Sequence, residues 1–368
     1  MGFLQNLIAL PGPETVHNVF FPGLGLSFDL NRVAIIILGR PIYWYGIIIA
    51  CGLFLAVWLC TRWGMRFGIN GDQIIDMMLF AVPAALVAIR VYYVVFNLSI
   101  FQNEDGSLNW GKILNYSDGG LAIYGAIISS AIVLLIFCHV RKISFLAFAD
   151  LGVHGLFIGQ LVGRWGNFMN VEAFGSVTAA PWRMCGASIA DYMLREGHVD
   201  EAGYQAILSG SLGVHPTFFY ESAWNFVGLL LVYFMGKKRK FDGQCFLFYV
   251  FWYGLGRAWI EGLRTDSLYL YVGSTIRVSQ LVAGIAAVGG VIAEILLTKK
   301  FRDKPLMVEL PLNSENRARM KKLDGPTAFA GTDAALPASA SRAEFVEKTA
   351  AWNEAVKAEL DKQNKEQK

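Results

Sequence analysis

The stretch LAFADLGVHGLFIGQLVGRWGNFMNVEAFG, residues 146–175, decides what kind of protein this sequence can form. Its first half is mostly apolar and approaches the ~20 residues that a helix needs to cross a lipid bilayer. Its second half, from Gly163 to Gly175, holds an arginine, two asparagines and a glutamate. The stretch therefore predicts a membrane-spanning helix that ends in a cluster of polar side chains.

The composition of the whole chain agrees with a membrane protein. Of its 368 residues, 55% are hydrophobic and only 17% are charged, and the mean hydropathy is +0.43, more apolar than an ordinary soluble domain. A net charge of +3 is too small to indicate nucleic-acid binding. The five cysteines are odd in number and show no CxxC spacing, so they indicate neither a disulfide framework nor a metal site.

Seven segments are apolar and long enough to span a membrane, and basic residues cluster after the first, third, fifth and seventh. These segments cover residues 41–60, 73–97, 119–140, 146–163, 217–235, 245–261 and 278–297. Because loops rich in Lys and Arg stay in the cytoplasm, the N-terminus is expected outside and the C-terminus inside. The sequence predicts an all-α polytopic membrane protein with seven transmembrane helices.

The chain outside these spans divides into three parts. Residues 1–40 lack the pattern of a signal peptide and are expected to form a retained arm outside the membrane. Residues 41–298 form the helical domain, in which the long connection at about 170–216 is expected to fold as a small outer cap. Residues 299–368 lose the hydrophobicity and are expected to form a cytoplasmic tail.

Polar residues of six spans fall at a similar depth, toward the outer face, when the direction of each span is taken into account. They are Tyr45, Arg90, Tyr124, Arg164, Asn167, His215, Glu221, Arg257 and Glu261. Charged side chains are costly in hydrocarbon and usually face the interior of a helical bundle or a water-filled cavity. The sequence therefore predicts a polar chamber that opens outward.

The charges of this chamber favour an anionic ligand. Arg90, Arg164 and Arg257 outnumber Glu221 and Glu261, and Glu172 lies just outside the span. The planar fork of arginine binds phosphate oxygens with two parallel hydrogen bonds and keeps its charge when partly desolvated. The phosphate of a lipid head group is the expected ligand.

Simpler explanations stay open for several of these residues. Arg257 and Glu261 are four residues apart on one helix and can neutralise each other. Arg164 can extend to the membrane interface, Tyr45 fits an aromatic belt, and His215 fits an exposed loop. The glycines of the polar cluster fit close helix packing.

Five motifs resemble one known family. GRWGNFMNVEAFG, from Gly163 to Gly175, resembles the signature of the prolipoprotein diacylglyceryl transferases. Four further motifs follow the order found in that family: YWYGIIIACG from Tyr43, GGLAIYGA from Gly119, HPTFFYES from His215 and YGLGRAWIEGLR from Tyr253. The resemblance covers roughly residues 30–300.

The resemblance implies a multi-pass enzyme of the bacterial inner (cytoplasmic) membrane with its active site toward the periplasmic side. Its reaction would transfer the diacylglyceryl group of phosphatidylglycerol to the lipobox cysteine of prolipoprotein precursors. A thioether forms and glycerol phosphate leaves. The expected partners are these two substrates and membrane lipids, with no nucleic acid, no metal and no cofactor.

The resemblance also suggests roles for individual residues. The expected catalytic residues are Arg164, Arg257, Tyr124, Asn167 and Glu172, and the expected substrate-binding residues are Tyr45, Arg90, Gly175, His215, Glu221 and Glu261. The sequence departs from the family at Tyr124, where enterobacterial members carry a histidine proposed as the base. Tyrosine ionises only near pH ~10 in water, so Tyr124 is expected either to be assisted by arginines or to hydrogen-bond the head group.

Two other functions stay open. A lipid or anion transporter or flippase with an outward-facing, arginine-lined cavity would also place charges inside the membrane. An enzyme that attacks the head group at phosphorus, rather than at carbon, would use the same arginines.

Overall fold

The computed structural model describes residues 8–9, 12, 16–103, 105–116, 119–120, 122–141, 143–265, 278–301 and 306. The chain forms two compact units, and each is described by itself. The first comprises Met1–Leu59, Gly152–Arg239 and Gln244–Lys300; the second comprises Cys60–Leu151, Lys240–Gly243 and Phe301–Lys368. The predicted tail at 299–368 lies outside the described residues except for 299–301 and 306.

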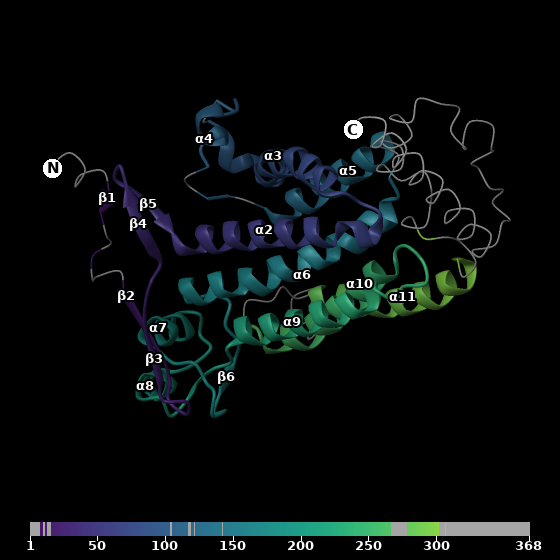
Figure 1. The fold of residues 1–368 in the computed structure, drawn as a ribbon. Helices are drawn as coiled ribbons and strands as arrows, with labels where there is room; N and C mark the ends of the chain where they lie inside the picture. Colours follow the sequence, from purple (N-terminus) through teal and green to yellow (C-terminus); the bar gives the residue numbers. More distant parts are fainter. Residues whose placement is uncertain are drawn as a thin grey trace, which may run out of the picture. The chain divides into compact units, whose positions relative to one another are not determined.

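A long helix occurs at each of the seven predicted segments (Figure 1). They are α2 (Trp44–Trp63), α3 (Gly71–Phe96), α5 (Ile123–Arg141), α6 (Phe145–Asn170), α9 (Thr217–Gly236), α10 (Gln244–Ile260) and α11 (Val278–Phe301). Six of these are long and apolar enough to cross a membrane. The seventh, α10, has only 17 residues and is not among them. The chain is mostly helical, which agrees with the prediction of an all-α polytopic membrane protein, while the seventh span and the orientation stay predictions.

The helix α6 is longer than the sequence analysis expected. Its predicted end was Gly163, but the helix continues to Asn170. No residue between Arg164 and Asn170 interrupts helical geometry, and the helix ends where Val171 adopts a positive φ of 51°. As a result, Arg164 and Asn167 lie on a regular helix and not on a loop.

The N-terminal arm contains short strands that the sequence analysis did not predict. Strands β2 (Val16–Phe21) and β3 (Leu26–Asn31) form an antiparallel hairpin, and β1 (Ile8–Ala9), β4 (Val33–Ile37) and β5 (Arg40–Tyr43) form a sheet in the order β1-β4-β5. The hairpin turn uses Gly25 at φ +64°, a conformation that suits glycine.

The region expected to form a cap contains two short helices and two short strands. These are α7 (Ala187–Arg195), α8 (Glu201–Ser209), β6 (Val177–Thr178) and β7 (Gly213–Val214). Phe20 of β2 and Cys185 exchange backbone hydrogen bonds of 2.9 and 2.8 Å, which join the arm to this region. Both share one hydrophobic core with the end of α6 and the start of α9, including Val19, Phe168, Met184, Ile189 and Phe218. This core fixes the polar end of α6.

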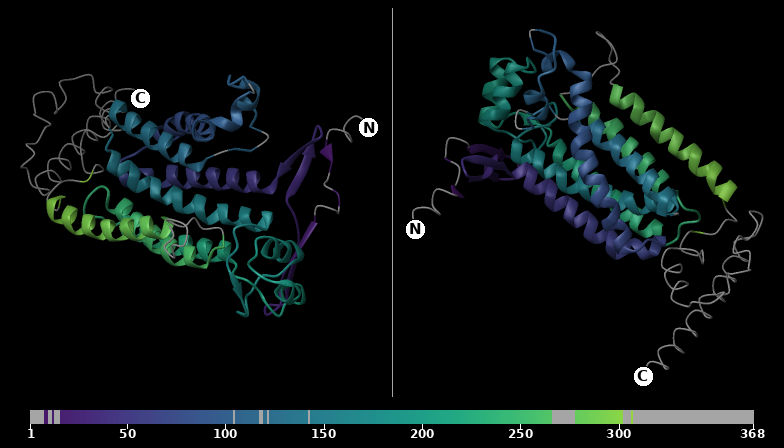
Figure 2. Two further views of the ribbon diagram at one scale, coloured as in Figure 1. Left: turned by 180° about the vertical axis from the view of Figure 1, so that it is seen from behind. Right: turned by 90° about the horizontal axis from the view of Figure 1, so that it is seen from above.

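A pair of tryptophans holds α9 against α10. The rings of Trp224 and Trp252 stack at 4.3 Å, and each indole N–H donates to the backbone carbonyl of the other residue at 3.0 Å. Gly256 lies directly beneath the Trp224 indole, where a side chain would collide with the ring. The two helices run side by side in both views (Figures 1 and 2). Their relative register is therefore fixed near the middle of each helix.

In the second unit, α3 packs along α5, and Arg90 of α3 is buried with 5% of its surface exposed. Its guanidinium donates five hydrogen bonds of 2.6–3.0 Å to five backbone carbonyls, those of Lys112, Ile113, Asn115, Gly119 and Gly120. The guanidinium carbon also lies 5.1 Å from the ring centre of Phe101 and 5.7 Å from that of Tyr116. All five N–H donors of this arginine are thus used by the chain itself.

Glycine is required where the loop meets this arginine. Gly120 has φ +70°, and a Cβ there would lie 2.8 Å from Nη1 of Arg90. The two glycines that begin the motif GGLAIYGA therefore pack directly against the Arg90 side chain. Arg90 organises the residues that lead into α5.

We expect Arg90→Leu to loosen residues 112–122, because several buried carbonyls lose their donor at once. Hydrogen exchange measured by mass spectrometry should accelerate by about 10-fold or more in this segment. Arg141→Ala is the matched control, because Arg141 is 51% exposed and pairs with the exposed Asp76; such pairs contribute at most about 1 kcal/mol. Unchanged exchange at 112–122 in Arg90→Leu would contradict an organising role.

Candidate functional site

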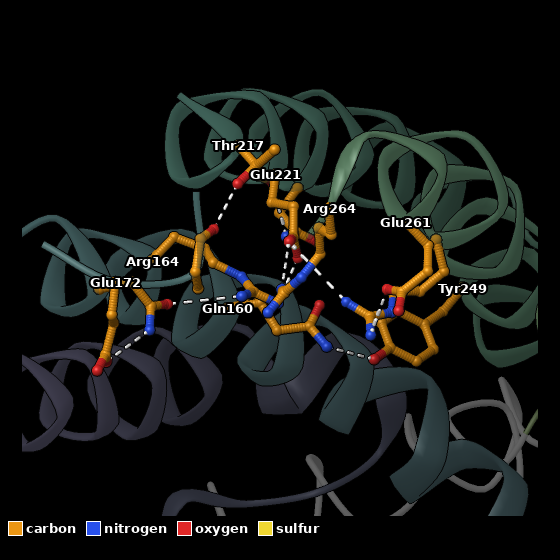
Figure 3. Close-up of polar contacts among 12 residues, drawn as sticks. Gln160, Arg164, Glu172, Thr217, Glu221, Tyr249, Glu261 and Arg264 are labelled. Carbon is orange, nitrogen blue, oxygen red and sulfur yellow. Dashed lines mark hydrogen bonds and ion pairs between the residues drawn. The ribbon is translucent and has the colours of Figure 1, made fainter. Parts of the chain in front are cut away.

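The polar end of α6 carries the first group of candidate residues. Arg164 forms an ion pair with Glu221 of α9 and donates from Nη1 to Oδ1 of Asn167 at 3.5 Å. Asn167 donates in turn to Oε1 of Glu172 at 3.0 Å, and Asn170 donates to the same oxygen at 3.1 Å. Figure 3 shows this chain of contacts from Glu172 to the Arg164 side chain. Three of the five predicted catalytic residues are thereby connected.

Glu221 is the centre of the site. Its side chain is 5% exposed and contacts three arginines: Arg164 of α6, Arg264 at 3.3 Å and Arg257 of α10 at 3.9 Å. Figure 3 shows Arg164 and Arg264 converging on this carboxylate. A buried carboxylate is tolerated when it is paired, and here the partners come from three separate segments of the first unit.

Arg257 is the most exposed arginine of this group. Its Nη2 lies 2.7 Å from Oε2 of Glu261, four residues along the chain, so the simple pairing considered from the sequence does occur. Its Nη1 is 3.9 Å from Glu221, beyond hydrogen-bonding distance. Its side chain is 24% exposed, compared with 21% for Arg164 and 11% for Arg264. With three arginines and two glutamates, the cluster has one positive charge in excess.

The backbone after α6 is strained where it presents Glu172. Val171 and Ala173, on either side of this glutamate, have φ values of 51° and 55°. Such values are uncommon for residues other than glycine, especially for a β-branched residue such as valine. Two hydrogen bonds hold the turn. The Glu172 N–H donates to the backbone carbonyl of Asn167 at 3.1 Å, and Thr217 Oγ1 donates to the carbonyl of Ala173 at 2.5 Å.

Gly175 closes the signature by a close approach of three segments. Its N–H donates to the carbonyl of His215 at 2.8 Å, and Ser176 N–H donates to that of Leu263 at 2.6 Å. A Cβ at Gly175 would lie 2.8 Å from both His215 Cβ and the Leu263 carbonyl oxygen. The packing explanation for this glycine is therefore sufficient, and its close contacts bring Arg264 beside the turn that carries Glu172.

Tyr45 packs on the signature helix. It lies in the first turn of α2, and a Cβ on Gly166 of α6 would be 2.8 Å from its ring carbon Cδ2. The glycine between Trp165 and Asn167 thus makes room for the tyrosine ring. Tyr45 is 39% exposed.

His215 is held in one orientation by two neighbours. The indole of Trp182 donates to the Tyr220 hydroxyl at 2.5 Å, and this hydroxyl lies 3.1 Å from Nδ1 of His215. Depending on the tautomer of His215, the hydroxyl either donates a hydrogen bond to Nδ1 or accepts one from it. Burial lowers the pKa of His215 below its usual value, so the ring is neutral at pH 7.

Two predicted site residues, Arg90 and Tyr124, belong to the second unit. Tyr124 lies in the first turn of α5 and is 63% exposed, with its ring 6.2 Å from that of Tyr92. Their roles toward the substrate stay predictions.

The sequence analysis missed Arg264, Gln160 and Tyr249. Arg264 is the last letter of the motif YGLGRAWIEGLR, three residues after Glu261 and directly after the 3₁₀ helix η4 (Glu261–Leu263). It could have been found from its spacing. Gln160 of α6 donates to the Tyr249 hydroxyl of α10 at 2.8 Å, and both lie beside the ion pairs (Figure 3); an uncharged pair of this kind leaves no signal in one sequence.

In the part of the chain that the structure describes, no group of three or more His, Cys, Asp or Glu residues could hold a metal ion.

Comparison with known proteins identifies the family. The family model described as prolipoprotein diacylglyceryl transferase matches residues 32–296. The chain is 39% identical over 260 residues to the phosphatidylglycerol–prolipoprotein diacylglyceryl transferases of Bacillus mycoides (strain KBAB4) and Bacillus cereus (strain Q1). Each alignment covers 71% of this chain and 89% of the relative. The matched region includes both the signature turn and the three arginines around Glu221, and the chain belongs to the prolipoprotein diacylglyceryl transferase family.

Proposed function

We propose that this chain transfers the diacylglyceryl group of phosphatidylglycerol to the cysteine thiol of a prolipoprotein. The observation that carries the proposal is the cluster of Arg164, Arg257 and Arg264 around one buried glutamate in a chain of this family. Its excess positive charge suits a phosphate, and Arg257 is the most exposed of the three arginines.

The proposed reaction develops negative charge on the leaving phosphate, where the arginines can stabilise it. The cysteine sulfur attacks the glycerol carbon that carries the phosphate, a carbon–sulfur bond forms, and the carbon–oxygen bond to phosphate breaks. The thiol loses its proton, and glycerol phosphate leaves with the bond's electrons. Arg257 stabilises the negative charge on the leaving phosphate, and Arg164 supports it, because fixed donors act strongly in a site from which water is excluded. Nearby guanidinium groups also favour the thiolate form of the substrate.

The other predicted residues take supporting roles in this proposal. Asn167 and Glu172 hold Arg164 through the hydrogen bonds at the end of α6, and Tyr45 borders the head group at the rim. His215 has a neutral ring and is one candidate to accept the thiol proton; Tyr124 is another candidate, or a hydrogen-bond donor to the head group. Arg90 acts by ordering the loop before α5, because its donors are used by carbonyls.

The proposed setting is the bacterial cytoplasmic membrane. The helix α10 serves as the seventh span, because 17 residues is near the lower limit for crossing the hydrocarbon core. The arm of residues 1–40 and the cap at about 170–216 then lie on the periplasmic side with the active site. The tail of residues 299–368 lies in the cytoplasm, in keeping with the basic residues after α11.

The transporter interpretation is not supported, because the comparisons find a transferase family. Attack at phosphorus is tested by product analysis, since only attack at carbon leaves a diacylglyceryl thioether on the peptide.

The function is tested with purified protein, phosphatidylglycerol and a synthetic lipobox peptide. We expect mass spectrometry to show a diacylglyceryl group on the cysteine and free glycerol phosphate. Arg257→Ala should lower kcat/KM by about 100- to 1,000-fold, the loss seen when one donor to a developing charge is removed. Arg257→Lys should lose most of this activity too, because an ammonium lacks the planar fork.

Arg195→Ala is the control for these variants. Arg195 belongs to the same unit, is 70% exposed and pairs with its neighbour Glu196. Its kcat/KM should stay within about twofold of the parent value. Equal losses in Arg195→Ala and Arg257→Ala, or an unmodified peptide with folded protein, would refute the assignment.

Glu221 and Glu172 should differ in their effect on stability. Glu221→Gln removes the negative charge that three arginines share, so we expect the free energy of unfolding to fall by about 3–5 kcal/mol. Glu172→Gln changes an exposed carboxylate that accepts two amide hydrogen bonds, so its cost should be no more than about 1 kcal/mol. Thermal unfolding in detergent micelles compares the two; equal stabilities would mean that Glu221 does not hold the site together.

A further inference from the structure

A small cavity lies between α9 and α10, next to the arginine cluster of the first unit. Its volume is about 10 Å³, roughly the space for one water-sized group. It is lined by Glu221, Trp224 and Asn225 of α9 and by Tyr253, Gly256, Arg257 and Ile260 of α10. The stacked tryptophans hold both walls, so the cavity is a built feature of the helix pair.

Asn225 lines this cavity and has an unsatisfied acceptor. Its residue surface is 3% exposed, and its Nδ2 donates to the backbone carbonyl of Glu221 at 2.8 Å, one turn earlier. The amide orientation follows from that bond, because the flipped amide would place two carbonyl oxygens against each other. Within the described residues, Oδ1 has no hydrogen-bond partner. Buried polar atoms are nearly always paired, so either a water or a ligand must supply the donor that this atom lacks.

The charges around the cavity favour a neutral hydrogen-bond donor over a cationic one. Arg257 and Glu221 are the charged residues that line it, and they belong to the cluster with one positive charge in excess. A cationic head group would meet this excess charge, whereas a neutral hydroxyl would not. A hydroxyl has the size of the cavity and supplies the single proton that Oδ1 lacks.

We propose that Asn225 is a specificity residue whose Oδ1 accepts a hydrogen bond from a head-group hydroxyl while Arg257 holds the adjacent phosphate. The inference rests on the proposed function and adds to it the residue that distinguishes a glycerol head group from one without hydroxyls. Asn225 touches the departing part of the lipid and not the reacting carbon.

The test compares two lipids with identical acyl chains, phosphatidylglycerol and phosphatidylpropanol, which lacks the head-group hydroxyls. The parent protein should prefer phosphatidylglycerol by about 10- to 100-fold in kcat/KM, because a site built for a hydroxyl rejects an analogue without it. Asn225→Leu should lose activity on phosphatidylglycerol by a similar factor and show almost no preference. Its kcat/KM on phosphatidylpropanol should stay within about threefold of the parent value.

Two further variants make the result decisive. Asn225→Asp keeps an oxygen acceptor, so it should retain a preference for phosphatidylglycerol even where its overall rate falls. Gln205→Leu alters an exposed amide of α8 that donates to Glu201 and should leave the preference unchanged. Because the preference is a ratio measured within one variant, any loss of folded protein cancels.

The outcome that overturns the inference is a full preference for phosphatidylglycerol in Asn225→Leu. Oδ1 would then be satisfied by a bound water and not by the head group. That result leaves the proposed function intact, whereas a parent protein that modifies no peptide with either lipid refutes the function itself.

Discussion

The burial of one carboxylate, that of Glu221, is the constraint on which the rest of the site depends. A charge removed from water requires partners, and this glutamate takes them from α6, from α10 and from the segment after η4. The helices must therefore meet at one point for the chain to be stable. The same meeting point collects guanidinium groups that outnumber the local carboxylates. The ion pairs that stabilise this point thus also produce the local excess of positive charge.

Contacts in the surrounding structure fix the relative positions of the helices that meet at Glu221. The tryptophan pair fixes α9 against α10, and Trp165 of α6 donates to Ser222 of α9 at 3.2 Å, beside Glu221. The hydrophobic core shared by the N-terminal hairpin and residues 171–218 anchors the end of α6. Each of these contacts uses neutral groups, in addition to the ion pairs of Glu221.

Much of this could be predicted from the sequence, for identifiable reasons. The positions of the long helices follow from apolar segments of membrane length, and Arg164, Glu221 and Arg257 were grouped because charges inside such segments are costly. The strands of the arm were missed because β4 and β5 adjoin an apolar span and show no clear alternation. Arg264 was missed because it follows the span in which depth was estimated. The five carbonyl partners of Arg90 lie 22 to 30 residues away, and a single sequence gives no sign of such loop closure. The positive φ values at Val171 and Ala173 are equally invisible, since neither residue favours them.

Those two residues have a consequence for how the protein balances function against robustness. Glycine would adopt the left-handed conformation at both positions without steric cost, yet the chain has valine and alanine there. The backbone of the turn around Glu172 is therefore strained, and packing elsewhere in the protein offsets the conformational cost. Valine and alanine have fewer accessible backbone conformations than glycine, so the Glu172 carboxylate samples a narrower range of positions. Strain at this turn lowers the stability of the protein, but it also fixes the position of the Glu172 carboxylate more precisely.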